Sequence, residues 1–393
     1  MVKKDERKSV LSHDLSRRDF LKAAMITSAA GLVAACSPLP TTKPTPTLTD
    51  TSAPMLTDIP TPTPAPVLDN IPDSALRRPE VIKFFPDVPK SKVVRTRHAG
   101  VWDGANFVPL AIRQMLDTSI VQLTSITDAT EAWKSLFSPD EHIAIKVNSY
   151  TTHALLAMSV CDCLQAAGIP PEQIFIYDRY SNSLLYDFLI FAGIPKLNRD
   201  GSGVRCYGTN EQGPNVRSSS DPTDHYVMGW RIMDTDIGLS EILLNNHALI
   251  NISALSTVTF AGMGISCALK NHFGTLNCPS EFHKDRFARG VTELNALPPI
   301  QKRSRLVIGD ILPAQTTNYS GRYIIGDHTL LMSFDPVAHD AVALQLATEA
   351  YTSLQLDTQT LAAQAIPWLE EASSAGLGTN EPANMEVLDV NLF

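Results

Sequence analysis

The feature that most constrains the fold is an alternation of short apolar runs with helix-length segments in the second third of the chain. Residues 142–148 are predicted to form a strand, residues 154–167 a helix that stops at Gly168, and residues 174–178 the next strand. A strand, a helix and a strand of these lengths form a crossover unit, so the two strands should be parallel and lie close together.

The same alternation continues toward the C-terminus. Further strands are predicted at residues 248–252, 305–310 and 329–334, and further helices at residues 265–272 and 336–351. This order predicts the α/β class, with a largely parallel sheet and helices on both of its faces. The pattern leaves open whether the elements form one body or two lobes.

The N-terminal segment carries the features of an export signal. Arg17 and Arg18 precede a weakly apolar run, residues 23–35, which ends in small residues before Cys36. A paired arginine in this position is typical of the twin-arginine export route, and small residues before a cysteine resemble the lipoprotein cleavage box. The run is shorter than the roughly 20 residues that a membrane-spanning helix needs. We therefore expect the twin-arginine export machinery and, through acylated Cys36, the lipid bilayer to be partners, with the protein on the outer face of the cytoplasmic membrane.

The sequence divides the chain into three segments. Residues 1–36 are the signal peptide with its lipobox cysteine, residues 37–73 are a linker dominated by Pro and Thr, and residues 74–393 are the α/β domain. Proline-rich sequence favours extended backbone and cannot build a core, so the linker should act as a stalk. The remainder is long enough for one large or two medium domains.

Composition and missing motifs exclude several classes of function. The formal net charge is −9 and becomes more negative once residues 1–35 are removed, which disfavours nucleic acid as a partner. The sequence has no GxSxG, GxxxxGK[ST] or strand-linked GxGxxG motif. It also has no CxxCxxC run, so an iron-sulfur cluster is not expected. Cys267 and Cys278 flank a glycine turn, and both a disulfide and two separate thiols remain open.

Polar residues gather where the predicted strands end. Open parallel sheets bind ligands beyond the carboxyl ends of their strands, so a shared sheet would place these residues along one edge. The set comprises Lys146, Asn148, Asp178, Arg179, Asn251, Ser253, Asp310 and Asp335. Lys146 is the most informative of them, because a lysine inside an apolar strand is costly to bury without an anionic partner.

Several members of this set also have a purely structural explanation. Asp335 precedes Pro336, and an aspartate followed by proline is typical of a helix N-cap and first helical position. Asp178 and Asp310 could be turn residues that bond to local backbone. A cap or turn residue can still contact a ligand, so both interpretations stay open.

The densest polar cluster spans residues 267–275 and contains Lys270, Asn271, His272 and Gly274. A helix end explains one such charge, because cations favour the negative end of the helix dipole and glycine favours the left-handed cap. His272 and the nearby His283 are candidate metal ligands, together with His339, Asp335 and Asp340, since imidazole and carboxylate suit zinc, iron or nickel. Spacing singles out no ligand set, so a divalent metal is one option and the cofactor remains unknown.

Three stretches resemble the domain of unknown function 362 family. They are Lys146-Val147-Asn148, the run from Leu269 to Gly274, and the run from Phe334 to Asp340, and the similarity extends from about residue 95 to about residue 351. The resemblance implies that the family's motif positions are Lys146, Asn148, Lys270, Asn271, Gly274, Asp335 and Asp340. The chain departs from many relatives because it lacks a Lys-x-His element after the third strand and a ferredoxin-like module.

Two hypotheses follow. In the first, the protein is a metal- or cofactor-dependent enzyme that acts on a small anionic substrate, with Lys146, Lys270, Asp335 and Asp340 in catalysis. Its substrate contacts would be Asn148, Asp178, Asn271 and Gly274, with His272 or His283 assisting. In the second, the protein is a tethered lipoprotein that binds a small molecule without catalysis, as the missing catalytic motifs suggest.

Overall fold

The computed structural model describes residues 70–149, 151–180, 203–209, 225–313, 316–319 and 321–393. All of them belong to one compact unit, which favours one body over two lobes. The predicted export signal, Cys36 and most of the linker lie outside the described residues. Near the start of the described part, Asp73 already accepts a hydrogen bond from Arg303 Nη1 at 2.9 Å. None of the described helices is long and apolar enough to cross a membrane.

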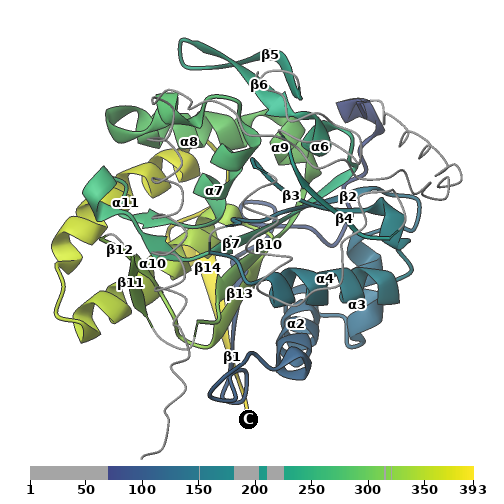
Figure 1. Ribbon diagram of the computed structural model, residues 1–393, viewed down its shortest axis with the longest axis horizontal. Helices are drawn as coiled ribbons and strands as arrows, with labels where there is room; N and C mark the ends of the chain where they lie inside the picture. The colour runs from purple at the N-terminus through teal and green to yellow at the C-terminus, as the bar shows by residue number, and fades with distance from the viewer. Residues whose placement is uncertain (1–69, 150, 181–202, 210–224, 314–315, 320) are drawn as a thin grey trace, which may run out of the picture. The chain divides into compact units, whose positions relative to one another are not determined.

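The described part is built on an eight-stranded sheet (Figure 1). All strands except β13 run in the same direction, so the predicted α/β class with a largely parallel sheet is confirmed. In spatial order the strands are β14 (Met385–Leu392), β1 (Ser91–His98), β13 (Thr329–Ser333), β10 (Ser304–Ile311), β7 (Ala248–Ala254), β2 (Ile143–Lys146), β3 (Ile174–Asp178) and β4 (Arg205–Gly208).

The predicted crossover unit is confirmed. β2 and β3 pair in parallel with Ile143 opposite Ile174, and α4 (Ala154–Ala166) connects them. The helix ends just before Gly168, whose φ of +97° lies in the left-handed region that favours glycine. On its other edge β2 pairs in parallel with β7, which places Lys146 opposite Asn251.

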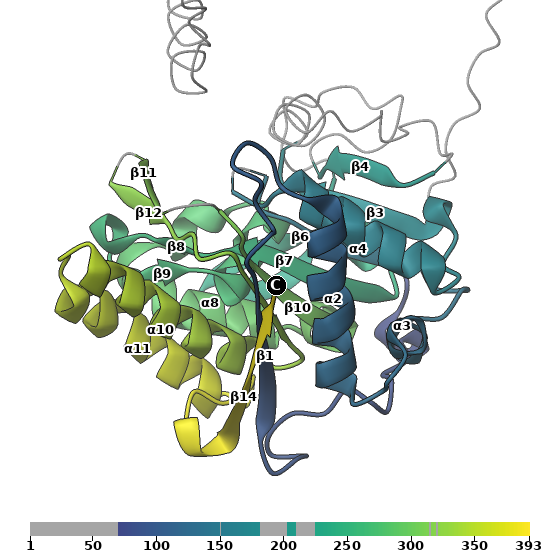
Figure 2. The ribbon, with the colours of Figure 1, turned by 90° about the horizontal axis from the view of Figure 1, so that it is seen from below.

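Helices cover both faces of the sheet (Figure 2). On one face, α4 packs with α2 (Pro109–Thr124) and α3 (Ala129–Leu136) against Ile143 and Ile145 of β2. The opposite face of β2 begins with Ala144 and packs into a second core. Six helices contribute to that core: α6 (Glu241–Leu244), α7 (Ala268–Asn271), α8 (Phe287–Ala296), α9 (Pro298–Arg303), α10 (Pro336–Ser353) and α11 (Thr358–Ser374). Because side chains alternate along a strand, Lys146 belongs to this second face.

Short strands form two smaller sheets beside the main one. They form a small sheet in the order β11 (Thr317–Tyr319), β12 (Arg322–Ile324), β8 (Ser256–Thr257) and β9 (Ile265–Ser266), and a hairpin of β5 (Tyr226–Ile232) and β6 (Thr235–Ser240). The helix predicted over residues 265–272 was therefore too long. Its first two residues pair with β8, and the helix starts only at Ala268.

The expectation of one shared polar edge is wrong for Asp335. β13 runs antiparallel to β10, with Ser333 opposite Val307, so the residue after β13 lies at the edge where β10 begins. Lys146, Asp178 and Asp310 lie at the other edge, where the parallel strands end. Asp335 therefore lies at the opposite edge of the sheet from Lys146, Asp178 and Asp310, because β13 is antiparallel to its neighbours.

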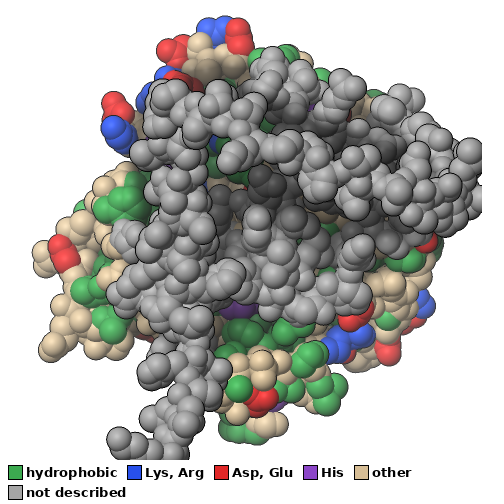
Figure 3. Space-filling model, in the orientation of Figure 1, with side chains coloured by type: hydrophobic (Ala, Val, Ile, Leu, Met, Phe, Trp, Pro, Cys, Tyr) green, Lys and Arg blue, Asp and Glu red, His purple; other side chains and the backbone are tan. Residues whose placement is uncertain are grey.

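The visible surface carries mixed charge. On the face drawn in Figure 3, Lys and Arg side chains of the described residues lie next to Asp and Glu side chains at the margins rather than forming a continuous basic patch. This agrees with the negative net charge of the chain.

Candidate functional site

The ammonium group of Lys146 uses all of its hydrogen-bond donors within the protein. Its side chain is 1% exposed, and Nζ donates to Asp178 Oδ1 at 2.8 Å, Asn271 Oδ1 at 3.2 Å and the Val147 carbonyl at 2.7 Å. An ammonium group has three donors, so none is left for a ligand. Burial lowers the pKa of Lys146, while the Asp178 carboxylate opposes that shift. The anionic partner that the sequence demanded is therefore Asp178.

Asp178 and Gly274 complete this buried pair. Asp178 Oδ2 accepts hydrogen bonds from Ser149 N at 2.9 Å and Ser149 Oγ at 2.8 Å. A Cβ atom on Gly274 would lie 2.4 Å from Asp178 Oδ1 and 2.6 Å from Lys146 Nζ. Only glycine fits this approach, so Gly274 lets the chain after α7 pack directly on the ion pair.

A network of amides connects α7 to the sheet. Asn271 Nδ2 donates to Asn251 Oδ1 at 2.7 Å and to the Ile252 carbonyl at 3.1 Å. Asn251 Nδ2 in turn donates to His272 Nε2 at 3.1 Å. Burial, and next the charge of Lys146, lower the pKa of His272 to about 3, so this imidazole is neutral at pH 7. Since its Nε2 already accepts a hydrogen bond, His272 acts as part of the packing rather than as a ligand.

Asn148 orders the loop that follows β2. Its backbone N donates to Thr152 Oγ1 at 3.1 Å, and Thr152 Oγ1 donates to the Ile252 carbonyl at 3.4 Å. The Ile252 carbonyl near the end of β7 therefore accepts hydrogen bonds from both Thr152 and Asn271. It links the loop after β2 to helix α7. Lys146, Asn148 and Asp178 thus lie at one edge of the sheet, as their places at the strand ends predicted. Asn271 and Gly274 join them there, and the five residues form a scaffold.

Lys270 differs from Lys146 because no described residue forms a hydrogen bond or an ion pair with it. It is partly buried, and within the described residues its Nζ has neither a hydrogen bond nor a carboxylate, only the Phe273 ring at 5.8 Å from the ring centroid. Burial first, then the charges of Arg322 and Lys146, lower its pKa to about 8. A substantial fraction of Lys270 is therefore the neutral amine near pH 8.

Arg322, in strand β12, is a second partly buried cation. Its Nε donates to Ser256 Oγ at 2.7 Å, its side chain is partly buried, and burial lowers its pKa. No carboxylate among the described residues pairs with it. Lys270 and Arg322, called the cation pair below, are thus two partly buried cations for which the described residues provide no carboxylate partner.

His283 packs against the ring of Phe273, which also lies near Lys270 Nζ. Its Nδ1 is 2.9 Å from the Pro279 carbonyl, and its ring contacts Phe273 edge-on with centroids 5.3 Å apart. Since a carbonyl only accepts, Nδ1 carries the hydrogen and Nε2 keeps the lone pair. Burial and the charge of Lys270 lower the pKa of His283. Within the described residues neither His272 nor His283 belongs to a group of three metal-binding side chains, whereas the third candidate histidine, His339, does.

Sequence reasoning missed two residues near this edge. His153 donates its backbone N to Asp310 Oδ2 at 2.6 Å, and its Nδ1 lies 3.0 Å from both oxygens of the same buried carboxylate. The position of His153 at the start of a helix that follows a parallel strand was the available signal. Arg322 sits on a three-residue strand outside every motif, so the sequence offered no signal for it.

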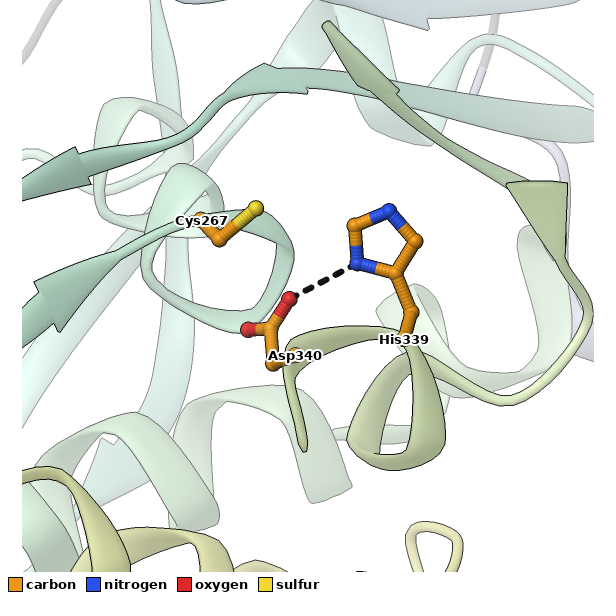
Figure 4. Close-up of side chains that lie close together, drawn as sticks. All are labelled: Cys267, His339 and Asp340. Carbon is orange, nitrogen blue, oxygen red and sulfur yellow. Dashed lines mark hydrogen bonds and ion pairs between the residues drawn. The ribbon is translucent and has the colours of Figure 1, made fainter. Parts of the chain in front are cut away.

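Cys267, His339 and Asp340 form a separate buried cluster whose ligand atoms lie within 4.8 Å of one another (Figure 4). Asp340 accepts from Ala268 N and Leu269 N, each at 2.9 Å, and its Oδ1 also lies 2.9 Å from His339 Nδ1. These bonds hold the first turn of α7, so the structure gives Asp340 a structural role. Cys267 Sγ and His339 Nε2 keep ligand capacity for a divalent metal. Neither Cys267 nor Cys278 is in a disulfide.

Asp335 has a structural role as well. It caps α10, with Oδ1 accepting from Val337 N and Ala338 N at 2.9 Å each. Oδ2 accepts from Ser91 Oγ at 2.7 Å and Thr379 N at 3.0 Å. Four donors surround a carboxylate that is 0% exposed, so no side of it faces a ligand.

These features define an α/β protein with a polar, partly cationic cluster where the parallel strands of its sheet end. A comparison with protein families matches residues 142–345, just over half of the chain, to the family described as Domain of unknown function (DUF362). The chain therefore belongs to this family, as its motifs indicated. The matched range contains the scaffold, the cation pair, Asp335 and Asp340. A search of curated proteins found no match.

Proposed function

We propose that the protein binds a small anionic ligand at the cation pair, Lys270 and Arg322. The observation that carries the proposal is that Lys270 and Arg322 are both partly buried cations and that no carboxylate among the described residues pairs with either. The charge of Arg322 also contributes to the lowered pKa of Lys270. Removing a cation from water without an anionic partner is unfavourable, so a bound anion would relieve the cost.

The residue types favour a carboxylate or a phosphate as the anionic group. A guanidinium can offer two parallel N–H donors to either group, and an ammonium adds a point charge. The scaffold of Lys146, Asp178, Asn271 and Gly274 supports this site by fixing α7 against the ends of β2 and β3. Anion binding is common to the enzyme and the binding-lipoprotein hypotheses.

Ligand-dependent thermal stability tests the proposal. Inorganic phosphate, sulfate and pyruvate should each raise the melting temperature of the full-length chain by mass action, and Lys270→Met should lose the increase. Phosphate and sulfate also stabilise proteins non-specifically, so Lys83→Met, which removes an exposed lysine, is the matched control. Equal increases in the wild type, Lys270→Met and Lys83→Met would contradict the proposal.

We also propose that the chain is exported by the twin-arginine route and anchored through Cys36. Replacing Arg17 and Arg18 together by Lys should leave the protein in the cytoplasm, because the exporter reads the arginine pair. Cys36→Ser should instead be exported and recovered without membrane attachment. Fractionation with an antibody measures both. Membrane attachment of the Lys-Lys variant equal to that of the wild type would contradict the export route.

A further inference from the structure

We propose that Cys267, His339 and Asp340 bind one Zn²⁺ ion, which joins the start of α7 to the start of α10. Cys267 is the residue directly before α7, and His339 and Asp340 lie in the first turns of α10. This inference goes beyond the proposed anion site and does not depend on it, because the two sites share no residue.

The three candidate ligand atoms lie close together. They are all within 4.8 Å of one another, and His339 Nδ1 is 2.9 Å from Asp340 Oδ1 (Figure 4). In a tetrahedral zinc site with bonds of about 2.0–2.3 Å, neighbouring ligand atoms are roughly 3.3–3.6 Å apart. The observed separations bracket these values. Rotation of the Cys267 thiol about its Cα–Cβ bond brings Sγ to the required distance.

The hydrogen bonds of the cluster leave the atoms that face one another able to bind a metal. Asp340 Oδ1 accepts from Ala268 N and Oδ2 accepts from Leu269 N, so each oxygen keeps a second lone pair. A metal ion would replace the hydrogen between Oδ1 and His339 Nδ1. A Cβ atom on Gly309 would lie 2.7 Å from His339 Nε2, so Nε2 packs against β10 and Nδ1 is the nitrogen that faces the other two ligands.

Charge balance favours a dication in this cluster. Cys267 is 1% exposed, and His339 and Asp340 are 0% exposed. Among the described residues no Lys or Arg forms an ion pair with Asp340. One thiolate and one carboxylate together carry two negative charges, which Zn²⁺ neutralises while the imidazole stays uncharged. A neutral site costs less to bury than separate charges do.

The donor set selects zinc over the harder cations. A thiolate and an imidazole suit Zn²⁺, whereas Mg²⁺ and Ca²⁺ prefer oxygen ligands alone. Ser253 Oγ lies 3.5 Å from Cys267 Sγ and can donate a hydrogen bond to the thiolate, as residues around metal ligands commonly do. Three protein ligands leave the fourth tetrahedral position to a water molecule.

Cobalt substitution tests the site, because a thiolate ligand gives Co²⁺ a sulfur-to-cobalt charge-transfer absorption band. The untagged full-length chain is produced in medium that contains Co²⁺ in place of Zn²⁺, and its cobalt content and absorption are measured. We expect about one Co²⁺ per chain and the sulfur band. Added Zn²⁺ should replace the cobalt, and added Mg²⁺ should not. His339→Gln should retain at least tenfold less cobalt, because even the loss of a supporting hydrogen bond weakens metal binding about 10–100-fold.

Two cysteine variants show whether the sulfur ligand is Cys267. Cys267→Ser keeps the size of the side chain and should lose the band. Cys163→Ser is the matched control and should keep it, because Cys163 is a fully buried thiol of α4 outside the cluster. A wild-type chain without the band, or a band that survives in Cys267→Ser, would overturn the metal site. The wild-type measurement decides the question even where a variant does not fold.

Discussion

Lys146→Met is expected to lower the free energy of unfolding by about 3–5 kcal/mol, the cost of leaving one member of a buried ion pair without its partner. The substitution keeps most of the side-chain volume and removes the ammonium that contacts Asp178 and Asn271. Asp178 would keep only its two bonds to Ser149. Chemical denaturation of the full-length variant measures the change.

Lys134→Met is the matched control for this prediction. Lys134 Nζ pairs with Glu131 Oε1 at 2.8 Å, the same distance as in the buried pair, but both side chains are largely exposed. Exposed pairs contribute about 0–1 kcal/mol, so the control should change stability little. Similar losses for Lys134→Met and Lys146→Met would show that the buried pair does not organise the scaffold.

Asp335→Ala is expected to destabilise the protein by about 3–5 kcal/mol. It removes the acceptor of four hydrogen bonds and leaves Val337 N, Ala338 N and Thr379 N buried without partners, at about 1–3 kcal/mol each before local relaxation. Burial raises the pKa of Asp335 while these donors oppose the shift, so the site depends on all of them. The melting transition and the denaturant midpoint measure the loss.

Asp357→Ala provides the comparison at an exposed cap. Asp357 Oδ1 accepts from Gln359 N and Thr360 N at 3.0 Å each, which reproduces the capping bonds of Asp335 at the surface. Removing an exposed N-cap costs about 1 kcal/mol, because water can satisfy the freed donors. If Asp335→Ala unfolded no more easily than Asp357→Ala and also lost ligand binding, the structural assignment of Asp335 would be wrong.

The spacing of apolar residues was sufficient to predict the elements that depend on local sequence. The strand, helix and strand around α4 follow from apolar spacing and a terminal glycine, and they place Lys146 at a strand end. The need for an anion near Lys146 also followed from its apolar surroundings. Its identity as Asp178 required the parallel register, which puts Tyr177 opposite Lys146 and Asp178 one residue beyond.

The rest depended on contacts between distant segments. Whether Asp335 joins the polar edge is decided by the antiparallel direction of β13, which its apolar sequence does not encode. The difference between Lys146 and Lys270 depends on which acceptors reach each ammonium. Arg322 reaches the site only through the small sheet of β8 and β12, which pairs Ser256 with Ile324 across 68 positions of sequence.

The most direct test of the central claim is a double-mutant cycle on phosphate affinity, measured by calorimetry with Lys270→Met, Arg322→Met and the double variant. If both side chains bind one anion, each single substitution should weaken phosphate at least tenfold, consistent with about 1.5–3 kcal/mol for a charged hydrogen bond. The double variant should lose less than the product of the two single effects, because the lost contacts are coupled. Affinity unchanged by either substitution would contradict the account.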